Sequence, residues 1–359
     1  MGGVASVIKN YYQLISHEVV ADFIVTETDE RIPKDLREEL NSKGCHIFHV
    51  THFAKNMWRY YIEVGKIIKI GNYDIIHDNT KYFAFLSLSV ARKCKVPVRI
   101  CHVHNTVAAK EKWFLHRWFI YFSSKLSVRY ATSLLACSKE AGESMFDKHS
   151  FIILNNAIEP ESFQFDKTKR DYWRNEFDLN DKFVLLMVAR NDPLKRYDFA
   201  FKVFGKLFDI RNDARFLVVG LSENECQERD KLSLDLLPPQ VRKNIVMLGR
   251  RLDAHELLSA GDAFILTSEH EGFGISIVEA QANGLPCFVS DAIPHATKCT
   301  DLVHFMPTLR EEDLWAKEIS VVQQIQNRKD YSLEVEKSEY SIKKNKEVLM
   351  SIYGDENEK

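Results

Sequence analysis

The sequence predicts an α/β protein with two domains, each built on a mostly parallel sheet. Its 359 residues are enough for two separate hydrophobic cores. Short apolar runs alternate with longer segments of helical periodicity, the pattern of parallel sheets covered by helices on both faces. A polar run at 166–170 interrupts this alternation, which then starts again. We therefore expect domains at 1–165 and 166–340, with a C-terminal helix or tail at 341–359.

In the first domain, strand and helix patterns follow one another along the chain. Helices are expected at 5–15, 33–42, 54–70, 82–93 and 108–130, and strands at 21–26, 46–50, 73–77, 98–104, 133–137 and 152–155. A nucleotide-binding domain normally has a strand before its first Gly-rich turn, but Gly2 and Gly3 directly follow Met1. We therefore expect the first strand to be missing and a central position of the sheet to be empty. Gly2 and Gly3 form either a loop that approaches a phosphate or a second substrate, or a flexible terminus.

The second domain repeats the pattern. Strands are expected at 183–189, 215–219, 244–248, 263–267 and 287–290, and helices at 197–208, 254–260, 275–282, 311–326 and 333–352. A linker is expected near 160–172, around the polar run. Gly220 and Gly249 close two of the strands, and glycine at such positions allows the close approach of a nucleotide.

Composition excludes several classes of protein. Hydrophobic residues at 45% and charged residues at 28% are typical of a soluble globular chain. A net charge of −2 argues against a nucleic-acid binder. The seven cysteines are scattered without metal-ligand spacing, as expected for reduced thiols in the cytosol. No apolar run approaches the ~18 residues that a membrane span needs.

The segment 108–130 combines aromatic residues with positive charge. Its residues of these two kinds are Lys110, Lys112, Trp113, Phe114, Arg117, Trp118, Phe119, Tyr121, Phe122, Lys125, Arg129 and Tyr130. A basic aromatic helix of this kind can lie on an anionic membrane surface. The alternative is a helix buried in the core with a basic outer edge.

Histidines end two of the expected strands. His77 closes one strand, while His102 and His104 lie on one face of the next. Because ligands of parallel sheets bind at the carboxyl ends of strands, these side chains are candidates for a site. A metal bound by His102 and His104 is conceivable, but no third ligand is near in the sequence, so we expect no metal. A structural role is the alternative for either residue.

The stretch 268–280 is the strongest candidate for a binding site. The buried strand expected at 263–267 feeds the helix expected at 275–282 through a loop with two glycines. Such a loop leaves backbone N–H groups free at the helix N-terminus, where an anion or a sugar hydroxyl can bind. Glu271 and Glu279 are about two helical turns apart, too far for a close acid/base pair. Without a ligand they would be a helix-terminal charge and a solvated helix residue.

Two cations follow the first strand of the second domain. Arg190 and Lys195 come directly after the strand expected at 183–189. Cations at the carboxyl edge of a sheet can neutralise a bound diphosphate. Surface charge is the alternative for either residue taken alone.

The sequence EGFGISIVEA at 271–280, followed by NGLP at 283–286, resembles the E-x(7)-E signature of the retaining glycosyltransferases of family 4. These enzymes have the GT-B fold, in which two Rossmann-like domains with parallel sheets face each other across a cleft. The resemblance implies that the first domain binds the acceptor and the second the nucleotide-sugar. It also implies that the last helix crosses back to the first domain.

The resemblance assigns roles to individual residues. Glu271 would contact the donor sugar, and Glu279 the ribose. The loop at Gly272, Phe273 and Gly274 would meet the diphosphate and the sugar.

Four further assignments follow from other parts of the family pattern. Arg190 and Lys195 resemble its R-x(4)-K phosphate-binding pair. Arg250 lies in the loop that would contact the base. A histidine at the end of a comparable strand lies near the donor sugar and the acceptor; His104 is the first candidate for it and His102 the second. Gly2 and Gly3 resemble the family's Gly-Gly loop, which approaches the donor phosphate or the acceptor.

The resemblance is to bacterial enzymes of exopolysaccharide and capsule synthesis. It implies transfer of a hexose-type sugar, with retention and without a metal or cofactor, from a UDP-sugar to a hydroxyl of a lipid-linked or oligosaccharide acceptor. It places the protein in the cytoplasm, or peripherally on the inner face of the plasma membrane, with 108–130 facing anionic lipid. The alternatives are a GT-B epimerase or phosphorylase and a catalytically inactive membrane-associated partner protein. A dehydrogenase is disfavoured because no G-x-G-x-x-G follows any strand.

Overall fold

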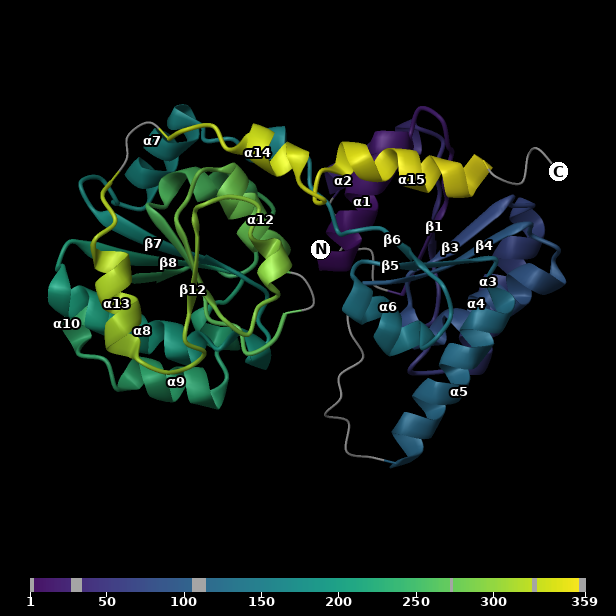
Figure 1. The fold of residues 1–359 in the computed structure, drawn as a ribbon, viewed down its shortest axis with the longest axis horizontal. Helices are drawn as coiled ribbons and strands as arrows, with labels where there is room; N and C mark the ends of the chain where they lie inside the picture. Colours follow the sequence, from purple (N-terminus) through teal and green to yellow (C-terminus); the bar gives the residue numbers. More distant parts are fainter. Residues whose placement is uncertain (1–2, 27–33, 105–113, 272–273, 325–327, 355–359) are drawn as a thin grey trace. The chain divides into compact units, whose positions relative to one another are not determined.

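The structure, a computed structural model, describes residues 3–26, 34–104, 114–271, 274–324 and 328–354 and divides into two compact units (Figure 1). Unit 1 consists of residues 1–157 and 342–359, and unit 2 of residues 158–341. The chain therefore leaves unit 1 once and returns to it with its last helix. Both units are Rossmann-like α/β units with parallel strands, so the predicted fold class is confirmed.

Unit 1 has two parallel sheets among its described residues, where the sequence predicts one sheet with an empty central position. In the first, β1 (Phe23–Val25) pairs with β2 (Ile47–His49). The second has the order β3-β4-β5-β6, formed by Ile75–Asp78, Val98–Val103, Ser133–Ala136 and Ile152–Ile153. In the described residues a side chain, not a strand pairing, links the segments before β1 and β3: the Tyr73 hydroxyl donates to Asp22 Oδ2 at 2.6 Å. Strand pairing therefore does not continue from the first sheet to the second within the described residues.

The helices of unit 1 lie close to the ranges that periodicity predicts, except the one at Lys139–Phe146, which was not predicted. They are α1 (Gly3–Ile15), α2 (Lys34–Ser42), α3 (Met57–Gly71), α4 (Ala84–Lys93), α5 (Phe114–Tyr130), α6 (Lys139–Phe146) and α15 (Ile342–Gly354), with a short turn η2 (Lys81–Phe83) before α4. Local signals set their ends, as in α3, where the Asn56 side chain accepts from the backbone N–H of Arg59 at 2.9 Å. Asn72 ends the same helix in the left-handed conformation. α4 packs between α3 and α5.

Unit 2 contains a six-stranded parallel sheet in the order β12-β11-β10-β7-β8-β9. In chain order the strands are Phe183–Val188, Ala214–Val219, Ile245–Met247, Ala263–Leu266, Cys287–Ser290 and Val303–Met306. The strand order reverses between β7 and β10, which are hydrogen-bonded neighbours. In open sheets of this type, ligands bind beyond the carboxyl ends of the strands at this switch point.

Helices lie on both sides of this sheet (Figure 1). The longer ones are α7 (Lys167–Glu176), α8 (Tyr197–Ile210), α9 (Glu228–Asp235), α12 (Ile275–Ala282) and α13 (Glu312–Ser320), and the shorter ones α10 (Pro239–Arg242), α11 (Ala254–Leu257) and α14 (Ser332–Lys337). Single turns lie at η3 (Pro160–Phe163), η4 (Pro193–Lys195), η5 (Glu223–Glu225), η6 (Leu258–Ala260) and η7 (His295–Thr297). Apolar side chains from α8 and the strands, among them Phe201, Phe204 and Phe216, are fully buried in the core.

Unit 2 differs from the sequence-based expectation at several places, one of which is the region of α9 and α10, where no helix was predicted. The expected linker at 160–172 is structured instead, because the Asp166 side chain accepts from the backbone N–H of Thr168 at 2.7 Å and caps α7. The expected helix at 333–352 is divided into α14 and α15, because Tyr340 leaves the helical path and its carbonyl accepts from the N–H of Ile158 at 3.0 Å. β12, an edge strand with an exposed His304, was not predicted.

Candidate active site

The carboxyl edge of the unit 2 sheet brings together the loops after β7, β8 and β10. Gly220, after β8, has a φ of +102°, and a Cβ atom there would lie 1.8 Å from the carbonyl oxygen of Ala189. Only glycine fits so close to the neighbouring strand end. The N–H of Gly220 donates to the carbonyl of Gly249 at 2.7 Å. This bond holds the loop that carries Arg250 beside the end of β8.

Lys195 and Glu271 form a largely buried ion pair at the switch point. Lys195 ends η4, and its Nζ pairs with Oε1 of Glu271. The Ser268 hydroxyl donates to the same oxygen at 2.7 Å. The Glu271 side chain is only 8% exposed, so the pair is shielded from solvent and is stronger than a surface pair. Both of its donors among the described residues engage Oε1, so no donor from that part of the chain occupies Oε2.

Backbone contacts lock the two loops that carry this pair. The Thr267 hydroxyl donates to the carbonyl oxygens of Lys195 at 2.9 Å and Arg196 at 3.0 Å. The N–H of Glu269 donates to the carbonyl of Leu194 at 2.9 Å. The pair is therefore preorganised, because neither loop can move without breaking bonds to the other.

A second charged network, which sequence reasoning missed, supports the first. Arg196 pairs with Glu269, and its Nε lies 2.9 Å from Asp198 Oδ1. Arg229 reaches the same Asp198 oxygen at 3.1 Å. Arg196 has a left-handed backbone at φ +54°, which turns the chain from η4 into α8. Its position next to Lys195 was the only signal in the sequence.

Arg190 and Arg250 are the available cations at this edge. Both are exposed, and neither side chain makes a hydrogen bond or ion pair with any residue that the structure describes. Arg190 follows the end of β7, and Arg250 lies in the loop beside β8. Because their charges are not neutralised by the protein, both can meet an anionic ligand.

Glu279 lies in α12, which begins after Gly274. Gly274 has a left-handed φ of +75° and its carbonyl accepts from the N–H of Ile277 at 2.9 Å. The carboxyl group of Glu279 has no hydrogen-bond or ion-pair partner within the described part of the chain. Burial raises its pKa from 4.5 to about 7. A carboxyl group kept without a partner in this position is available to a ligand that supplies hydroxyl donors.

Three of the predicted site residues cannot be placed in this way. Gly2, Gly272 and Phe273 lie outside the described residues. Gly3 is the first residue of α1, and not part of a preceding turn.

In unit 1 the predicted histidines lie in a buried polar cluster at the carboxyl ends of β3 and β4. His77 Nε2 lies 3.1 Å from His102 Nδ1, and His77 Nδ1 lies 2.9 Å from the hydroxyl of Tyr353. Burial, with repulsion from His104, lowers the pKa of His77 to about 3. Burial also lowers the pKa of His102 well below 6.5. Both rings are therefore neutral at pH 7. Tyr353 comes from α15, and nothing local in the sequence indicates this contact.

His104 is held on both sides by amides. Its Nδ1 lies 2.8 Å from Asn156 Oδ1 and its Nε2 lies 2.8 Å from Asn79 Oδ1. Burial lowers the pKa of His104 to about 4, opposed by the Asn156 bond, so the ring is neutral at pH 7. Asn79 also donates its amide to the carbonyl of His77, which fixes its oxygen toward His104 Nε2–H.

No metal cluster accompanies the histidines among the residues described: no three His, Cys, Asp or Glu side chains there are placed to bind one ion.

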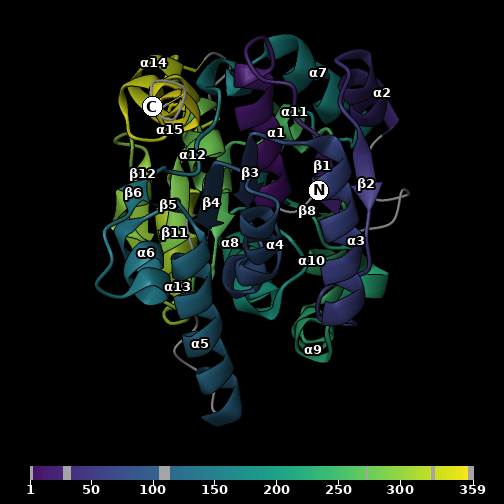
Figure 2. The ribbon, with the colours of Figure 1, turned by 90° about the vertical axis from the view of Figure 1, so that its right-hand side faces the viewer.

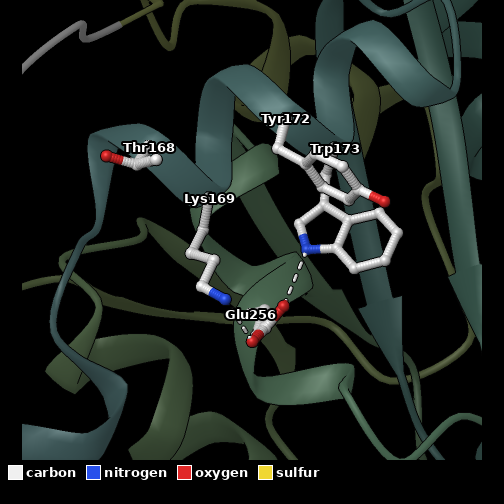
Figure 3. Close-up of a pocket in the computed structure, with 5 residues that line it drawn as sticks. All are labelled: Thr168, Lys169, Tyr172, Trp173 and Glu256. Carbon is white, nitrogen blue, oxygen red and sulfur yellow. Dashed lines mark hydrogen bonds and ion pairs between the residues drawn. The ribbon is translucent and has the colours of Figure 1, made fainter.

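A hollow of about 380 Å³ lies in unit 2, lined by Thr168, Lys169, Tyr172, Trp173 and Glu256 (Figure 3). Glu256 accepts from Lys169 at 2.6 Å and from the Trp173 indole at 3.3 Å. Three of its lining side chains, Lys169, Trp173 and Glu256, are thus paired with one another.

This hollow lies away from the candidate site. The helix α7, which forms one wall of it, is held to the amino end of β10 by Arg170 and Arg174, which both pair with Asp262. The hollow is thus at the opposite edge of the sheet from Lys195 and Glu271.

The same division of the chain is found in comparisons with known proteins. The family model described as Glycosyltransferase Family 4 matches residues 1–158. The model described as Glycosyl transferases group 1 matches residues 169–300, which include the switch-point residues.

Among curated relatives, EpsF of Bacillus subtilis, named as a glycosyltransferase, is 28% identical over 309 residues, covering 81% of this chain and 77% of EpsF. A galactosyltransferase of Escherichia coli, named for transfer from UDP-Gal to GlcNAc-diphosphoundecaprenol, is 28% identical over 64% of this chain. The match covers 61% of that enzyme, less than two thirds of its length.

Among solved structures, HepE of Anabaena, in complex with UDP and glucose, has a TM-score of 0.77 at 16% identity, covering 99% of this chain and 96% of HepE. WaaG, a glycosyltransferase involved in lipopolysaccharide biosynthesis, has a TM-score of 0.70 at 16% identity, covering 98% and 96%. These likenesses show that the two-unit GT-B fold extends along the chain. With both parts of the sequence matched by models of one enzyme class, the protein belongs to the family 4, or group 1, glycosyltransferases.

Proposed function

We propose that the protein transfers a hexose-type sugar from a UDP-sugar to a hydroxyl group of a lipid-linked or oligosaccharide acceptor, in the synthesis of a bacterial polysaccharide. The observation that carries this proposal is the set of charged groups at the carboxyl edge of unit 2: the largely buried Lys195–Glu271 pair, with Arg190 and Glu279, which have no partner among the described residues. These groups match the parts of a nucleotide-sugar in charge and hydrogen bonding. The complex of HepE with UDP and glucose supports UDP as the nucleotide.

In the donor site we assign the diphosphate to Arg190 and Lys195. Glu271 then accepts from hydroxyls of the sugar with Oε2, and Glu279 accepts from the ribose. The loop of Gly272, Phe273 and Gly274 approaches the diphosphate, and Arg250 lies toward the base.

The chemistry needs stabilisation of a departing diphosphate. The bond between the anomeric carbon and the diphosphate oxygen breaks, a bond to the acceptor oxygen forms, and the acceptor loses its proton. Preorganised cations stabilise the charge that develops on the leaving oxygen. We propose that Arg190 and Lys195 do this without a metal or cofactor, and that the product keeps the anomeric configuration of the donor, as the E-x(7)-E resemblance implies.

We assign the acceptor to unit 1. His104 is proposed to contact the transferred sugar and the acceptor, with His102 as the second candidate. Because amides hold both ring nitrogens of His104, its contact would use the backbone carbonyl or displace Asn79. Two relatives are named for acceptors on diphosphoundecaprenol, which supports a lipid-linked acceptor and action at the cytoplasmic face of the membrane.

The test is thermal unfolding with UDP, GDP, ADP and CMP, for the wild type, Arg190→Ala and Glu279→Ala. A nucleotide at about 100 times its dissociation constant should add about 2.7 kcal/mol of stability. We expect a shift with UDP that both substitutions abolish. Lys243→Ala, which removes an exposed cation elsewhere in unit 2, is the control and should keep the shift.

No shift with any of the four nucleotides, from a folded protein, would refute the donor site. Where UDP binds, NMR of the product formed from a UDP-hexose defines the anomeric configuration. Activity that survives exhaustive chelation supports transfer without a metal. Inversion, or loss of activity restored by Mg²⁺, would overturn those two parts of the proposal.

A further inference from the structure

The hollow of unit 2 has a fixed aromatic wall with an exposed ring beside it. It lies where α7 approaches α11, and Figure 2 shows these two helices next to each other. Trp173 is only 7% exposed, because Phe177 stacks on its indole with ring centroids 5.7 Å apart and the Arg251 guanidinium lies 4.9 Å from the indole centre. Tyr172 is 57% exposed, and its ring stands nearly perpendicular to the indole at 4.8 Å. The buried indole thus supports a tyrosine ring that faces solvent.

The polar part of the hollow offers hydrogen-bond donors and acceptors at one place. Lys169 Nζ donates to Glu256 Oε1 at 2.6 Å, and the Trp173 indole N–H donates to Glu256 Oε2 at 3.3 Å (Figure 3). An ammonium carries three donors and a carboxylate about four acceptor sites, so both groups have capacity left for a ligand. The side chains of Lys169 and Glu256 are 43% and 23% exposed, so a ligand can reach them.

Neighbouring side chains hold this wall in place. Arg170 and Arg174 anchor α7, because the guanidinium groups of both donate to the buried Asp262. Arg251, which covers the indole, is itself held by Asp253 through contacts of 2.8 and 2.7 Å. The ring and the ion pair therefore keep their spacing without a ligand, which lowers the entropic cost of binding one.

The charge of the hollow selects a neutral ligand. Lys169 and Glu256 cancel each other, so neither a phosphate nor a metal cation meets a net opposite charge there. A purely apolar ligand is disfavoured as well, because it would cover the ion pair without replacing its bonds to water.

The remaining chemistry fits a sugar. The C–H groups of a pyranose carry partial positive charge and pack on the negative face of an aromatic ring, while its hydroxyls both donate and accept. The volume of about 380 Å³ lies in the range of sites for small ligands.

We propose that this hollow is a saccharide-binding site separate from the donor site. The face of Tyr172 stacks on one pyranose ring of a neutral oligosaccharide, and the Lys169–Glu256 pair bonds hydroxyls of the bound sugar. This inference goes beyond the proposed function and does not rest on it, since the site can hold a saccharide whichever reaction the carboxyl edge performs.

The test is saturation-transfer NMR of the full chain with neutral oligosaccharides of glucose, mannose, galactose and N-acetylglucosamine. We expect transfer to the sugar protons of at least one of them, with a dissociation constant near about 1 mM. Tyr172→Ala should weaken this binding by about tenfold, because the stacked ring is lost. Glu256→Gln should weaken it by about fivefold, because a neutral acceptor bonds hydroxyls less strongly than a carboxylate.

Two matched controls are available. Tyr121→Ala removes another exposed tyrosine ring, which is 50% exposed on α5. Glu334→Gln changes a carboxylate that pairs with Lys329 at 2.6 Å, the same separation as in the Lys169–Glu256 pair. Both variants should bind the saccharide like the wild type. Circular dichroism and thermal unfolding confirm that each variant is folded, and if Tyr172→Ala does not fold, Glu256→Gln decides.

Three results would overturn the proposal. One is a folded wild type that transfers saturation to none of the oligosaccharides. The second is binding that Tyr172→Ala and Glu256→Gln leave unchanged. The third is binding that added UDP abolishes, which would place the saccharide in the donor site. Saccharide binding that Tyr172→Ala weakens, in a protein that shows no thermal shift with any nucleotide, would refute the donor site and support this one.

Discussion

Replacing Glu279 with Gln should stabilise the free protein and weaken nucleotide binding at the same time. The carboxyl group has no partner in the described part of the structure, and burial raises its pKa from 4.5 to about 7. Above pH 7 the ionised, buried carboxylate therefore lowers the stability of the folded protein. A pKa rise of this size corresponds to at most about 3 kcal/mol, and partial solvent access lowers the expected gain to about 1–2 kcal/mol.

The sign follows from the proton balance. Between about pH 4.5 and 7 the unfolded chain loses this proton while the folded chain keeps it, so this group lowers the stability of the wild type as the pH rises. Below pH 4.5 both states are protonated and the penalty vanishes. Glu279→Gln lacks the penalty at every pH. Its advantage in the free energy of unfolding should thus be present at pH 8 and absent near pH 4.5.

Binding should change in the opposite direction. A hydrogen bond to a charged acceptor is worth about 1.5–3 kcal/mol, so loss of the carboxylate should weaken UDP binding by roughly ten- to a hundredfold. The assays are denaturant unfolding at both pH values and calorimetric titration with UDP. A variant that is less stable than the wild type at pH 8, or that binds UDP equally well, would refute the reasoning.

The control is Glu271→Gln, the same substitution at the paired carboxylate. It should destabilise the protein, because it leaves the largely buried Lys195 ammonium without its counter-charge. Opposite signs at Glu271 and Glu279 would separate the loss of an ion pair from the loss of an unpaired charge.

Three further predictions follow from the structure. Arg190→Ala should weaken UDP binding by at least about tenfold with little change in thermal midpoint, because the side chain is exposed and unpaired among described residues; a lower midpoint without a change in affinity would contradict this role. Asp262→Asn should destabilise unit 2 by about 3–5 kcal/mol in denaturant unfolding, since it breaks buried contacts to Arg170 at 2.6 Å and Arg174 at 3.2 Å; a loss below about 1 kcal/mol would show that the arginines do not need this charge. Gly220→Ala should lower stability by more than about 1 kcal/mol and impair UDP binding, because the added Cβ meets the Ala189 carbonyl; a variant that unfolds like the wild type would exclude this close approach.

Local patterns in the sequence predicted most of the fold. The alternation of apolar strands and amphipathic helices is a local property, so β7, β8 and β10 and helices such as α8 lie close to the expected ranges. Glu271 and Glu279 also fall where their spacing suggests, in the loop and in the helix that follows. The pairing of Lys195 with Glu271 could not be predicted from the sequence, because 76 residues separate them and only the order of strands in the sheet brings them together.

Long-range contacts account for what the sequence could not predict. Residues 338–341 read as helix by periodicity, but hydrogen bonding with Ile158 ends α14 there. The His77–Tyr353 contact spans 276 residues of sequence. In α5 the periodicity correctly predicts a helix, yet it does not tell which face is outward: Ser123 and Ser127 are buried, whereas the larger Trp118 and Phe122 are exposed.

The return of the chain to unit 1 has a consequence for biosynthesis. Asn345 donates to the carbonyl of Asn155 at 2.8 Å and to the hydroxyl of Tyr11 at 3.0 Å, and Tyr353 meets His77. Until the ribosome has made α15, these buried polar groups of unit 1 lack their partners, whereas unit 2 is one continuous segment of nascent chain. Unit 2 can therefore complete its fold first, and the N-terminal half must wait for the last residues to be synthesised.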